Sequence, residues 1–391
     1  MLQVSVMTLK LNNLTMDKKR IGEIDIIKGL GILIIAVIHL VYRTKSGAAD
    51  YVLRSLGWSL ISVFFMMSGY FFTAGKRKVI QSWLHRLRYR VLPVVLAEFL
   101  LLVIGGVYCA FVHGYDFSDW LHDVAVTFLR PEWTVRISGE WGNGGVLYDN
   151  LSPAWFLYTL IWTELVFFPI AAWCEGGKRK VRWWTAVIVL TAVQVPLYIF
   201  VSPVSWQLQL IPLFTVFMLV GAKLRVMRAH EREWKLNPAA TAGISLVCFA
   251  VVIGLFLLGA DESYYRGQIG FTGGFDVLLI VVQLPFGALA FFALSKLIMR
   301  VRGLSYVLQW IGQSTVLFLM CHCFYGMIAA DVMQTYIKPG PMWYVENAGL
   351  SLTPEVFWKS VAGTAIAIIC CVLTRLVLDR IRSIKKRCSD N

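Results

Sequence analysis

Two histidines lie in long apolar segments of the chain, where side chains that exchange protons are unusual. His39 follows Lys28 by 11 residues, about three helical turns, so the two share a helix face and lie about 16 Å apart along the axis. An imidazole, with a reference pKa of about 6.5, suits a general base near neutral pH. We interpret Lys28 as a cation for a phosphate-bearing ligand and His39 as a base further in. Alternatively, Lys28 is an ordinary lysine at the membrane interface, and His39 only packs against a neighbouring helix.

Three further ionisable residues lie in apolar segments: Glu98, Glu164 and His322. An ionisable group inside a membrane helix is expected to have a partner or a function. We therefore expect each glutamate either to pair with an arginine or a histidine, or to orient a catalytic histidine. His322 lies toward the outer half of its segment, and two such histidines are more than helix packing usually supplies.

A basic run between two apolar segments reads Trp83-Leu-His-Arg-Leu-Arg-Tyr-Arg-Val-Leu-Pro93. In a helix, Arg86 and Arg90 are neighbours on one face. Guanidinium groups bind phosphate through paired hydrogen bonds, so Arg86, Arg88 and Arg90 are candidates to bind a nucleotide or coenzyme A. The enrichment of cytoplasmic loops in basic residues explains the same run without a ligand.

The small and sulfur-containing residues are weaker candidates for a catalytic or metal-binding role. Ser68 has the hydroxyl of a nucleophile, but Ser68-Gly69 is more typical of a close approach between two membrane helices. Cys321 and Cys323 flank His322, yet there is no second ligand pair, so we predict no metal site. The eight cysteines lie mostly in apolar segments and do not form the pattern of a disulfide framework.

The composition decides which elements must position these residues. Of the 391 residues, 58% are hydrophobic and only 15% charged, and mean hydropathy is +0.66. Soluble domains have about 45–50% apolar and about 25% charged residues, which excludes a soluble enzyme, a disordered chain and a coiled coil. Apolar stretches of about 20 residues predict an all-α, polytopic membrane protein with about ten transmembrane helices. They are Ile24–Tyr42, Trp58–Thr73, Val91–Val112, Pro153–Trp173, Trp183–Phe200, Val204–Ala222, Ala239–Ala260, Gly273–Ser295, Leu304–Ala330 and Glu355–Leu378.

The net charge of +14 predicts the orientation of the chain once the charges are counted separately for the two sides of the membrane. With the N-terminus in the cytoplasm, 29 of the 37 Lys and Arg residues lie in cytoplasmic segments. These segments then carry +21, the outer segments −5, and the two mid-helix glutamates −2. Because cytoplasmic loops are enriched in Lys and Arg, we predict that both termini are cytoplasmic. The charge therefore indicates contact with membrane lipid and not a nucleic-acid partner.

We expect one transmembrane domain, residues 21–380, between a disordered cytoplasmic tail at 1–20 and a basic cytoplasmic tail at 381–391. The longest outer segment, 113–152, is rich in acidic and tryptophan residues, and its Trp141-Gly-Asn-Gly-Gly run predicts a turn. This segment is either a lid or platform for an acceptor or a solvated connector.

Five blocks of the sequence resemble the acyltransferase-3 family of integral membrane acyltransferases, in the order typical of that family. Residues 24–39, IDIIKGLGILIIAVIH, are similar to its first-helix pattern of a basic residue, ten positions and a histidine. Residues 62–72, SVFFMMSGYFF, are similar to its FFxxSG-type second helix, and 310–322, WIGQSTVLFLMCH, to its late Gly…Ser/Thr…His helix. Residues 152–162, SPAWFLYTLIW, and the basic run ending at Pro93 resemble its WFL helix start and its arginine-rich segment.

Three positions depart from the family pattern. Lys28 stands where many relatives have arginine, so a bidentate contact is lost there. Leu87 stands where an arginine is expected, and either Arg86 or Arg88 substitutes for it. Leu319 stands where a tyrosine is frequent.

The resemblance implies that an acyl group, usually acetyl, moves from acetyl-CoA to a hydroxyl of a carbohydrate or another cell-envelope acceptor. Acetyl-CoA would be a cosubstrate, and no cofactor would be bound permanently. The expected location is the plasma membrane, with multiple passes. The phosphates of acyl-CoA would be bound at the cytoplasmic side by Lys28, Arg86, Arg88 and Arg90.

The catalytic residues that we expect are His39, His322 and Glu164. His39 would activate the attacking hydroxyl as general base, Glu164 or Glu98 would hold its tautomer, and His322 would orient the acceptor. In a variant of this mechanism, His39 or Ser68 carries the acyl group covalently before it is passed outward.

Two other classes of protein compete with this interpretation. A transporter or flippase of a glycan or lipid-linked precursor would also have about ten helices with buried charges, but the sequence lacks paired Gly/Pro-broken segments in corresponding halves. A regulatory membrane domain would bind a ligand without turnover.

Overall fold

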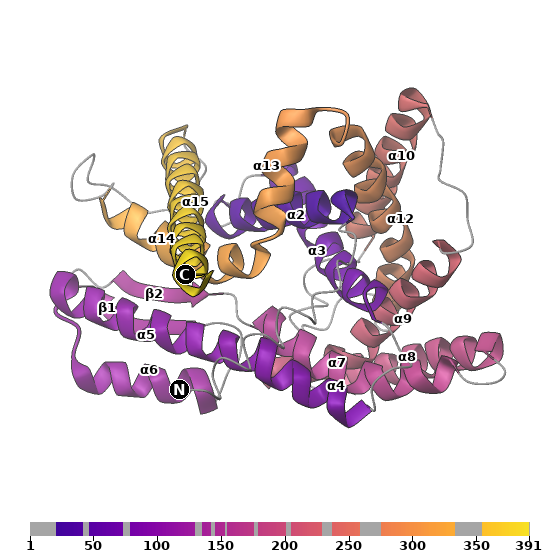
Figure 1. Cartoon of the computed structure of the whole chain (residues 1–391), viewed down its shortest axis with the longest axis horizontal. Coiled ribbons are helices and arrows are strands. Elements are labelled where there is room, and N and C mark those ends of the chain that lie inside the picture. The colour runs from indigo at the N-terminus through magenta and orange to yellow at the C-terminus, as the bar shows by residue number, and fades with distance from the viewer. Residues whose placement is uncertain are drawn as a thin grey trace.

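The structure is a computed structural model, and the part of the chain that it describes is almost entirely helical (Figure 1). It describes residues 21–41, 47–72, 79–129, 135–141, 145–152, 155–175, 179–200, 205–228, 237–258, 275–332 and 354–390. The predicted disordered tail at 1–20 lies outside these residues.

Each of the ten apolar segments predicted from the sequence is helical where the structure describes it. The helices are α2 (Gly22–Val41), α3 (Gly47–Tyr70), α4 (Val79–Arg86), α5 (Leu92–His113), α6 (Phe117–Leu129), α7 (Trp155–Glu175), α8 (Arg179–Phe200), α9 (Ile211–Arg228), α10 (Pro238–Leu257), α12 (Phe275–Ile298), α13 (Arg302–Gly312), α14 (Thr315–Val332) and α15 (Pro354–Asp390). A π-helical turn, Leu87–Val91, joins α4 to α5, and a 3₁₀ turn, Ser205–Leu210, precedes α9. Because α15 continues to Asp390, most of the predicted basic tail is helical.

Six helices in the described part of the chain are long and apolar enough to cross a membrane, so this is a membrane protein. They are Trp83–Val112, Phe156–Glu175, Leu208–Arg225, Pro238–Leu257, Leu279–Ile298 and Val361–Ile384. The pair α13 and α14 qualifies as a seventh span if the two are counted together. Ten spans, and an orientation with both termini inside, therefore remain predictions.

The ninth predicted span, Leu304–Ala330, is not one helix. It breaks between α13 and α14, whose axes differ by 83°. The break lies where α13 crosses α2, because a Cβ on Gly312 would lie 1.9 Å from the carbonyl oxygen of Asp25. Gly29 on α2 is the reciprocal contact, since its Cβ would lie 2.0 Å from the carbonyl oxygen of Leu308. The two helices therefore touch backbone to backbone, which side chains larger than hydrogen would prevent.

A second crossing of this kind joins α3 to α9. A Cβ on Gly69 would lie 1.9 Å from the carbonyl oxygen of Met218, and one on Gly221 would lie 1.8 Å from that of Met66. The close backbone approach predicted for Ser68-Gly69 is thus confirmed, and it places the end of α3 against the middle of α9.

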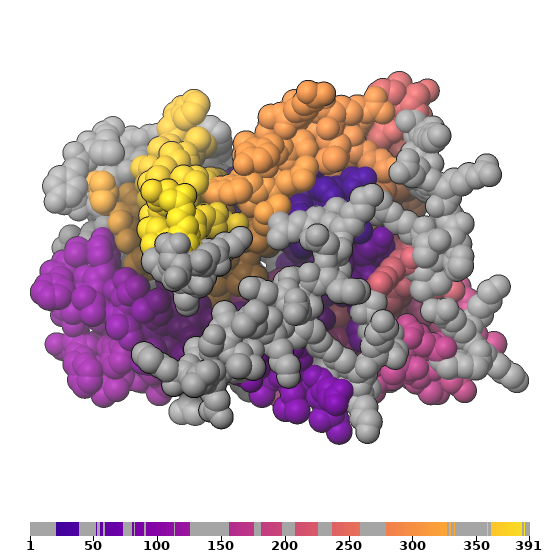
Figure 2. All heavy atoms as spheres, in the orientation of Figure 1, coloured from indigo at the N-terminus to yellow at the C-terminus, as the bar shows by residue number. Residues whose placement is uncertain are grey.

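The helices pack around two main buried clusters. One includes residues of α2, α5, α14 and α15, and the other joins α3, α7, α9 and α12. In Figure 1, α7 and α8 run side by side, and α10 lies against α12, which agrees with the contacts between these pairs. Figure 2 shows the orange surface of the segment around α13 against the indigo surface of the first helices.

Residues 113–152, the segment predicted to lie outside, hold the one departure from an all-α fold in the described residues. Strands β1 (Val135–Trp141) and β2 (Gly145–Ser152) pair antiparallel, with Trp141 opposite Gly145. Residues 142–144 of the predicted turn lie between these strands and outside the described part of the structure. Apolar and polar residues alternate at the start of β1, a period that fits a strand and not a helix.

Helix α6, which lies in the same segment, is fixed to α5. Trp120 Nε1 donates to the carbonyl oxygen of Leu102 at 3.1 Å, and the hydroxyl of Tyr115 donates to Asp123, which is buried. Burial, together with the bond to Asp123, raises the pKa of Tyr115, so its phenol stays protonated and remains a donor at neutral pH.

Candidate active site

Lys28 on α2 extends toward the end of α3. Its Nζ lies 3.9 Å from Asp25 Oδ1 and 5.4 Å from the centre of the Phe71 ring. The carboxylate and the ring both attract the ammonium group and so restrict its direction. Because 30% of its side chain remains exposed, Lys28 is accessible to an anionic ligand.

Arg86 turns inward from the end of α4 and pairs with Glu164 on α7. Arg86 Nη1 lies 2.8 Å from Glu164 Oε1, and the guanidinium group lies 5.3 Å from the centre of the Phe168 ring. Glu164 is buried, with 4% of its side chain exposed. The expectation that a buried glutamate pairs with an arginine is therefore confirmed for Glu164, and the pair ties the arginine-rich segment to α7.

The other two candidate arginines differ from Arg86. Arg88 is exposed, with its guanidinium group 5.7 Å from the centre of the Tyr89 ring. Arg90 lies in the π-helical turn, and its side chain is outside the described part of the structure. The wide turn, closed by a bond from Leu92 N–H to the Leu87 carbonyl, shifts the phase of the helix just where these arginines occur.

Phe71 and Phe72 connect Lys28 to Arg86 at the end of α3. The Phe72 ring stacks on Phe168 with centroids 5.1 Å apart, and Arg225 Nη1 on α9 donates to the Phe72 carbonyl oxygen at 2.6 Å. Three cations from three helices therefore gather where α3 ends, near its partly negative carbonyl groups. We call this group the α3-end cluster, and it comprises Lys28, Phe71, Phe72, Arg86, Glu164, Phe168 and Arg225. Sequence reasoning missed Arg225, which belongs to no motif and which we counted only as a cytoplasmic charge.

Glu98 on α5 has a different environment from Glu164. It is fully buried, and its Oε2 accepts a hydrogen bond from the hydroxyl of Tyr158 on α7. Its Oε1 has no hydrogen-bond partner among the described residues. Of the two buried glutamates, Glu98 is therefore the one with an oxygen available to another group. Tyr158 was not singled out in the sequence, although it lies in the WFL block.

His322 is buried in α14 with a defined tautomer. Its Nδ1 lies 2.8 Å from the carbonyl oxygen of Phe318, so Nδ1 carries the proton that it donates. The lone pair of the neutral ring is then on Nε2, which lies 3.4 Å from Cys323 Sγ. Nε2 is thus the acceptor atom of the ring, and Cys323 Sγ lies next to it. Within the described part of the chain, no group of three or more His, Cys, Asp or Glu residues could hold a metal ion.

His39 lies in the last two turns of α2, and its side chain is outside the described part of the structure. Its position follows from the helix. Ile32 belongs to the buried cluster shared by α2, α5, α14 and α15, and Ile35 packs against that cluster. His39 follows Ile35 by four residues and so lies one turn further along the same face.

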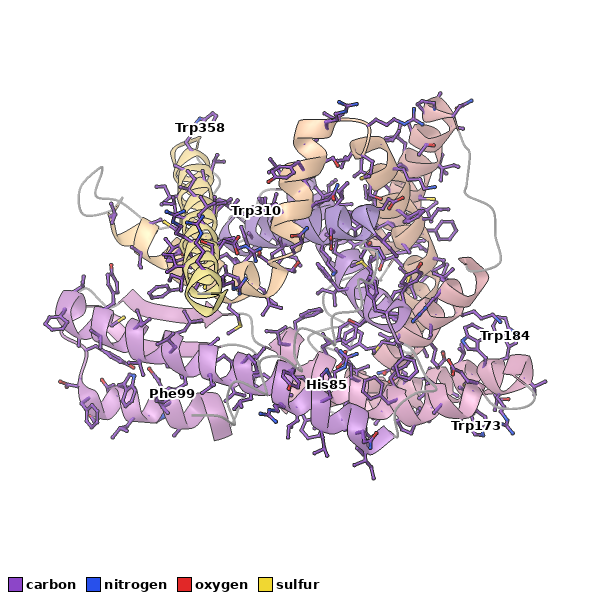
Figure 3. All side chains as sticks on the ribbon, in the orientation of Figure 1. His85, Phe99, Trp173, Trp184, Trp310 and Trp358 are labelled. Carbon is purple, nitrogen blue, oxygen red and sulfur yellow. The ribbon has the colours of Figure 1, made fainter. Side chains whose placement is uncertain are left out.

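Four residues thus lie along one face of α2: Lys28 in the α3-end cluster, then Ile32 and Ile35, and His39 at the far end. Ile32 is buried, so side chains of other helices pack against this face. Along it, Leu101 of α5 and Phe318 of α14 belong to the same buried cluster as Ile32, and these helices carry Glu98 and His322 respectively. Trp310 lies on the side of α13 that faces α15 (Figure 3), and its ring centre is 5.7 Å from the guanidinium group of Arg375.

Comparison with known proteins gives one finding. The sequence model of the acyltransferase-3 family, described as an acyltransferase domain, matches residues 21–376. Comparisons with curated proteins and with solved structures find no match. The family match spans nearly the whole chain and includes every motif discussed above. The chain therefore belongs to the acyltransferase-3 family and is a membrane acyltransferase.

Proposed function

We propose that the protein transfers an acyl group, most simply acetyl, from acyl-CoA to a hydroxyl of a carbohydrate or another cell-envelope acceptor at the plasma membrane. The observation that carries this proposal is the face of α2, which joins a three-cation cluster at Lys28 to His39 about 16 Å away. A cluster of cations suits the phosphates of a coenzyme A donor. A histidine at the other end suits proton transfer from a hydroxyl.

The proposed orientation supplies the donor from the cytoplasm. Lys28, Arg86, Arg88 and Arg90 all lie in segments that carry the cytoplasmic excess of positive charge under this orientation. The donor phosphates would be bound in this region, and the pantetheine arm would extend along α2. The acceptor would approach from the opposite side, where Trp141 and the acidic outer segment offer aromatic faces and hydrogen-bond acceptors to a sugar.

In the proposed reaction, His39 accepts the proton of the acceptor hydroxyl while the hydroxyl oxygen attacks the thioester carbonyl carbon. The carbon–sulfur bond then breaks, and the thiolate of coenzyme A takes the proton from His39. This sequence leaves an ester on the acceptor and free coenzyme A. His322, with its lone pair on Nε2, is proposed to accept a hydrogen bond from the acceptor.

Glu98 is the better candidate to hold the tautomer of His39. Glu164 is engaged by Arg86 at 2.8 Å, whereas Glu98 keeps one buried oxygen without a partner in the described residues. We therefore assign Glu164 to the positioning of Arg86, and Glu98 to the orientation of the general base. A carboxylate that accepts from Nδ1–H leaves Nε2 free to take the proton.

The test uses purified full-length protein in lipid vesicles, supplied with acetyl-CoA on one side and candidate acceptors on the other. We expect acceptor-dependent release of free coenzyme A that is lost in His39→Ala and in His39→Asn. Movement of an acceptor across the membrane that persists in His39→Ala, without thioester consumption, would instead establish a flippase. Coenzyme A release that is unchanged in both variants would remove His39 from the mechanism.

A further inference from the structure

The break between α13 and α14 places unsatisfied polar groups inside the fold. The first hydrogen bond within α14 runs from the Phe318 N–H to the Ser314 carbonyl oxygen, at 3.1 Å. The amides of Thr315, Val316 and Leu317 come before it, and the first amides of a helix have no acceptor within that helix. They carry the partial positive charge of the helix N-terminus.

Ser314 immediately precedes α14, where a serine normally caps the helix by accepting from these amides. The residue is 94% buried, and its hydroxyl has no hydrogen-bond partner among the described residues. The neighbouring hydroxyl of Thr315 turns the other way and donates to the Gly312 carbonyl oxygen at 2.7 Å. The Ser314 hydroxyl is therefore a buried donor without an acceptor among the described residues, next to the first amides of α14.

In lipid, an unsatisfied amide or hydroxyl costs several kcal/mol, and a broken span is tolerated where it lines a binding site. In many membrane proteins, the N-terminus of a half-helix points at an anionic group of the ligand. The exposed side chains of Gln313 and Val316 flank buried Ser314, so the junction is reached from the surface of the fold.

The crossing of α13 with α2 fixes where this junction lies. A Cβ on Gly312 would lie 1.9 Å from the Asp25 carbonyl oxygen and 2.9 Å from the Gly29 nitrogen. The junction is thus beside the turn of α2 that carries Lys28. The nearest carboxylate on that turn, Asp25, lies 3.9 Å from the Lys28 ammonium group, which offsets its charge.

We propose that the N-terminus of α14, with the Ser314 hydroxyl, is a binding site for a phosphate oxyanion. A phosphate there accepts from the first amides of α14 and from Ser314, as phosphates do at helix N-termini in other folds. A donor of the coenzyme A type and an anionic lipid headgroup both supply such a group. The choice of the donor as the source rests on the proposed function.

Two alanine variants distinguish a binding site from a structural hydroxyl. Ser314 and Ser305 are both buried on the broken span, but Ser305 Oγ accepts from Gln309 Nε2 at 2.8 Å. Ser314→Ala should leave the melting temperature unchanged and weaken coenzyme A binding about tenfold. Ser305→Ala should lower the melting temperature and leave coenzyme A binding unchanged. A loss of stability in Ser314→Ala with unchanged binding would overturn the proposal.

A third variant, Ser314→Asp, tests the site because it should raise the melting temperature and lower anion binding. The new carboxylate caps α14 itself, which should raise the melting temperature of the protein without ligand. It also occupies the amides and repels anions, so binding of coenzyme A and of inorganic pyrophosphate should fall below detection. Unchanged binding of both probes in this variant, together with unchanged lipid stabilisation, would exclude an anion site at the junction.

The source of the phosphate is tested in bilayer discs of phosphatidylglycerol or phosphatidylcholine. If Ser314→Asp abolishes coenzyme A binding in both lipids, the donor supplies the phosphate. If the variant keeps coenzyme A binding but loses a stabilisation specific to phosphatidylglycerol, the site holds a lipid headgroup and the donor assignment is wrong. Wild-type protein that binds pyrophosphate but not coenzyme A would contradict the proposed function while leaving the anion site in place.

Discussion

Arg86, which is half-buried, and Glu164, which is buried, form an ion pair with Nη1 and Oε1 2.8 Å apart although 78 residues separate them. The pair joins the arginine-rich segment to the helix that begins with the WFL block. Arg86 is thereby directed into the fold, while Arg88, two residues further on, stays at the surface. One member of the basic run thus has a structural anchor, and its neighbour remains available to a ligand.

We predict that Arg86→Met lowers the free energy of unfolding by about 3–5 kcal/mol, because it leaves the buried Glu164 without its cation. The double variant Arg86→Met with Glu164→Gln should regain a large part of that loss. Thermal unfolding in detergent measures both. Equal destabilisation by the single and the double variant would show that the charge of Glu164 is not the cause.

The two buried glutamates should respond differently to removal of their charge. Glu98→Gln should lower kcat about 100-fold with little change in KM for acyl-CoA, since an oriented base contributes at least that much to proton transfer. Glu164→Gln is the matched control, and we expect it to affect stability and KM more than kcat. Steady-state kinetics of the two variants decides the assignment, which fails if Glu164→Gln loses kcat and Glu98→Gln does not.

Lys28→Ala should raise KM for acyl-CoA about tenfold and change kcat less, because one charge-assisted contact to a phosphate is lost on binding. Arg182→Ala serves as the control, since Arg182 is also a cation on the predicted cytoplasmic side. Its guanidinium group lies 5.6 Å from the centre of the Trp173 ring, at the end of α7 seen in Figure 3. Equal KM values for Lys28→Ala and the wild-type protein would contradict the cytoplasmic donor site.

Because the backbones of α3 and α9 touch, we predict that one methyl group added at their crossing lowers the stability of the protein. Gly69→Ala places Cβ 1.9 Å from the Met218 carbonyl oxygen, so the helices must separate. We expect a loss of stability of about 1–3 kcal/mol or more, the range for overpacked sites. Gly243→Ala on α10, where a Cβ meets nothing within 4 Å, should leave the melting temperature unchanged or raise it. Similar melting temperatures for both variants would disprove the tight crossing.

The predicted orientation is tested by labelling single cysteines from each side of the membrane. Glu140→Cys in β1 should react with an impermeant maleimide added outside, and Lys78→Cys should react only after permeabilisation. The unsubstituted protein gives the background from its own cysteines. Labelling of both positions from the same side would overturn the proposed topology.

The sequence by itself determined the solvent and the helical segments. An apolar content of 58% requires lipid, and apolar runs of about 20 residues require backbone hydrogen bonds within each segment, so the helices follow directly. The common face of Lys28 and His39 also follows from the chain, because helical periodicity is a local property. For the hairpin of β1 and β2, the sequence indicated only a turn, because its pairing has an irregular register that no regular alternation of residues marks.

Only the tertiary structure decided how the helices pair their buried groups. Both glutamates look alike in sequence, yet one meets Arg86 from α4 and the other meets Tyr158, because the packing of α4 and α5 against α7 selects the partners. The broken ninth span is a similar case. Its apolar composition suits a single helix, but backbone contact at Gly29 and Gly312 fixes where α13 crosses α2, and the chain turns by 83° just beyond it. Contacts between distant segments depend on how whole helices pack, and no local pattern encodes them.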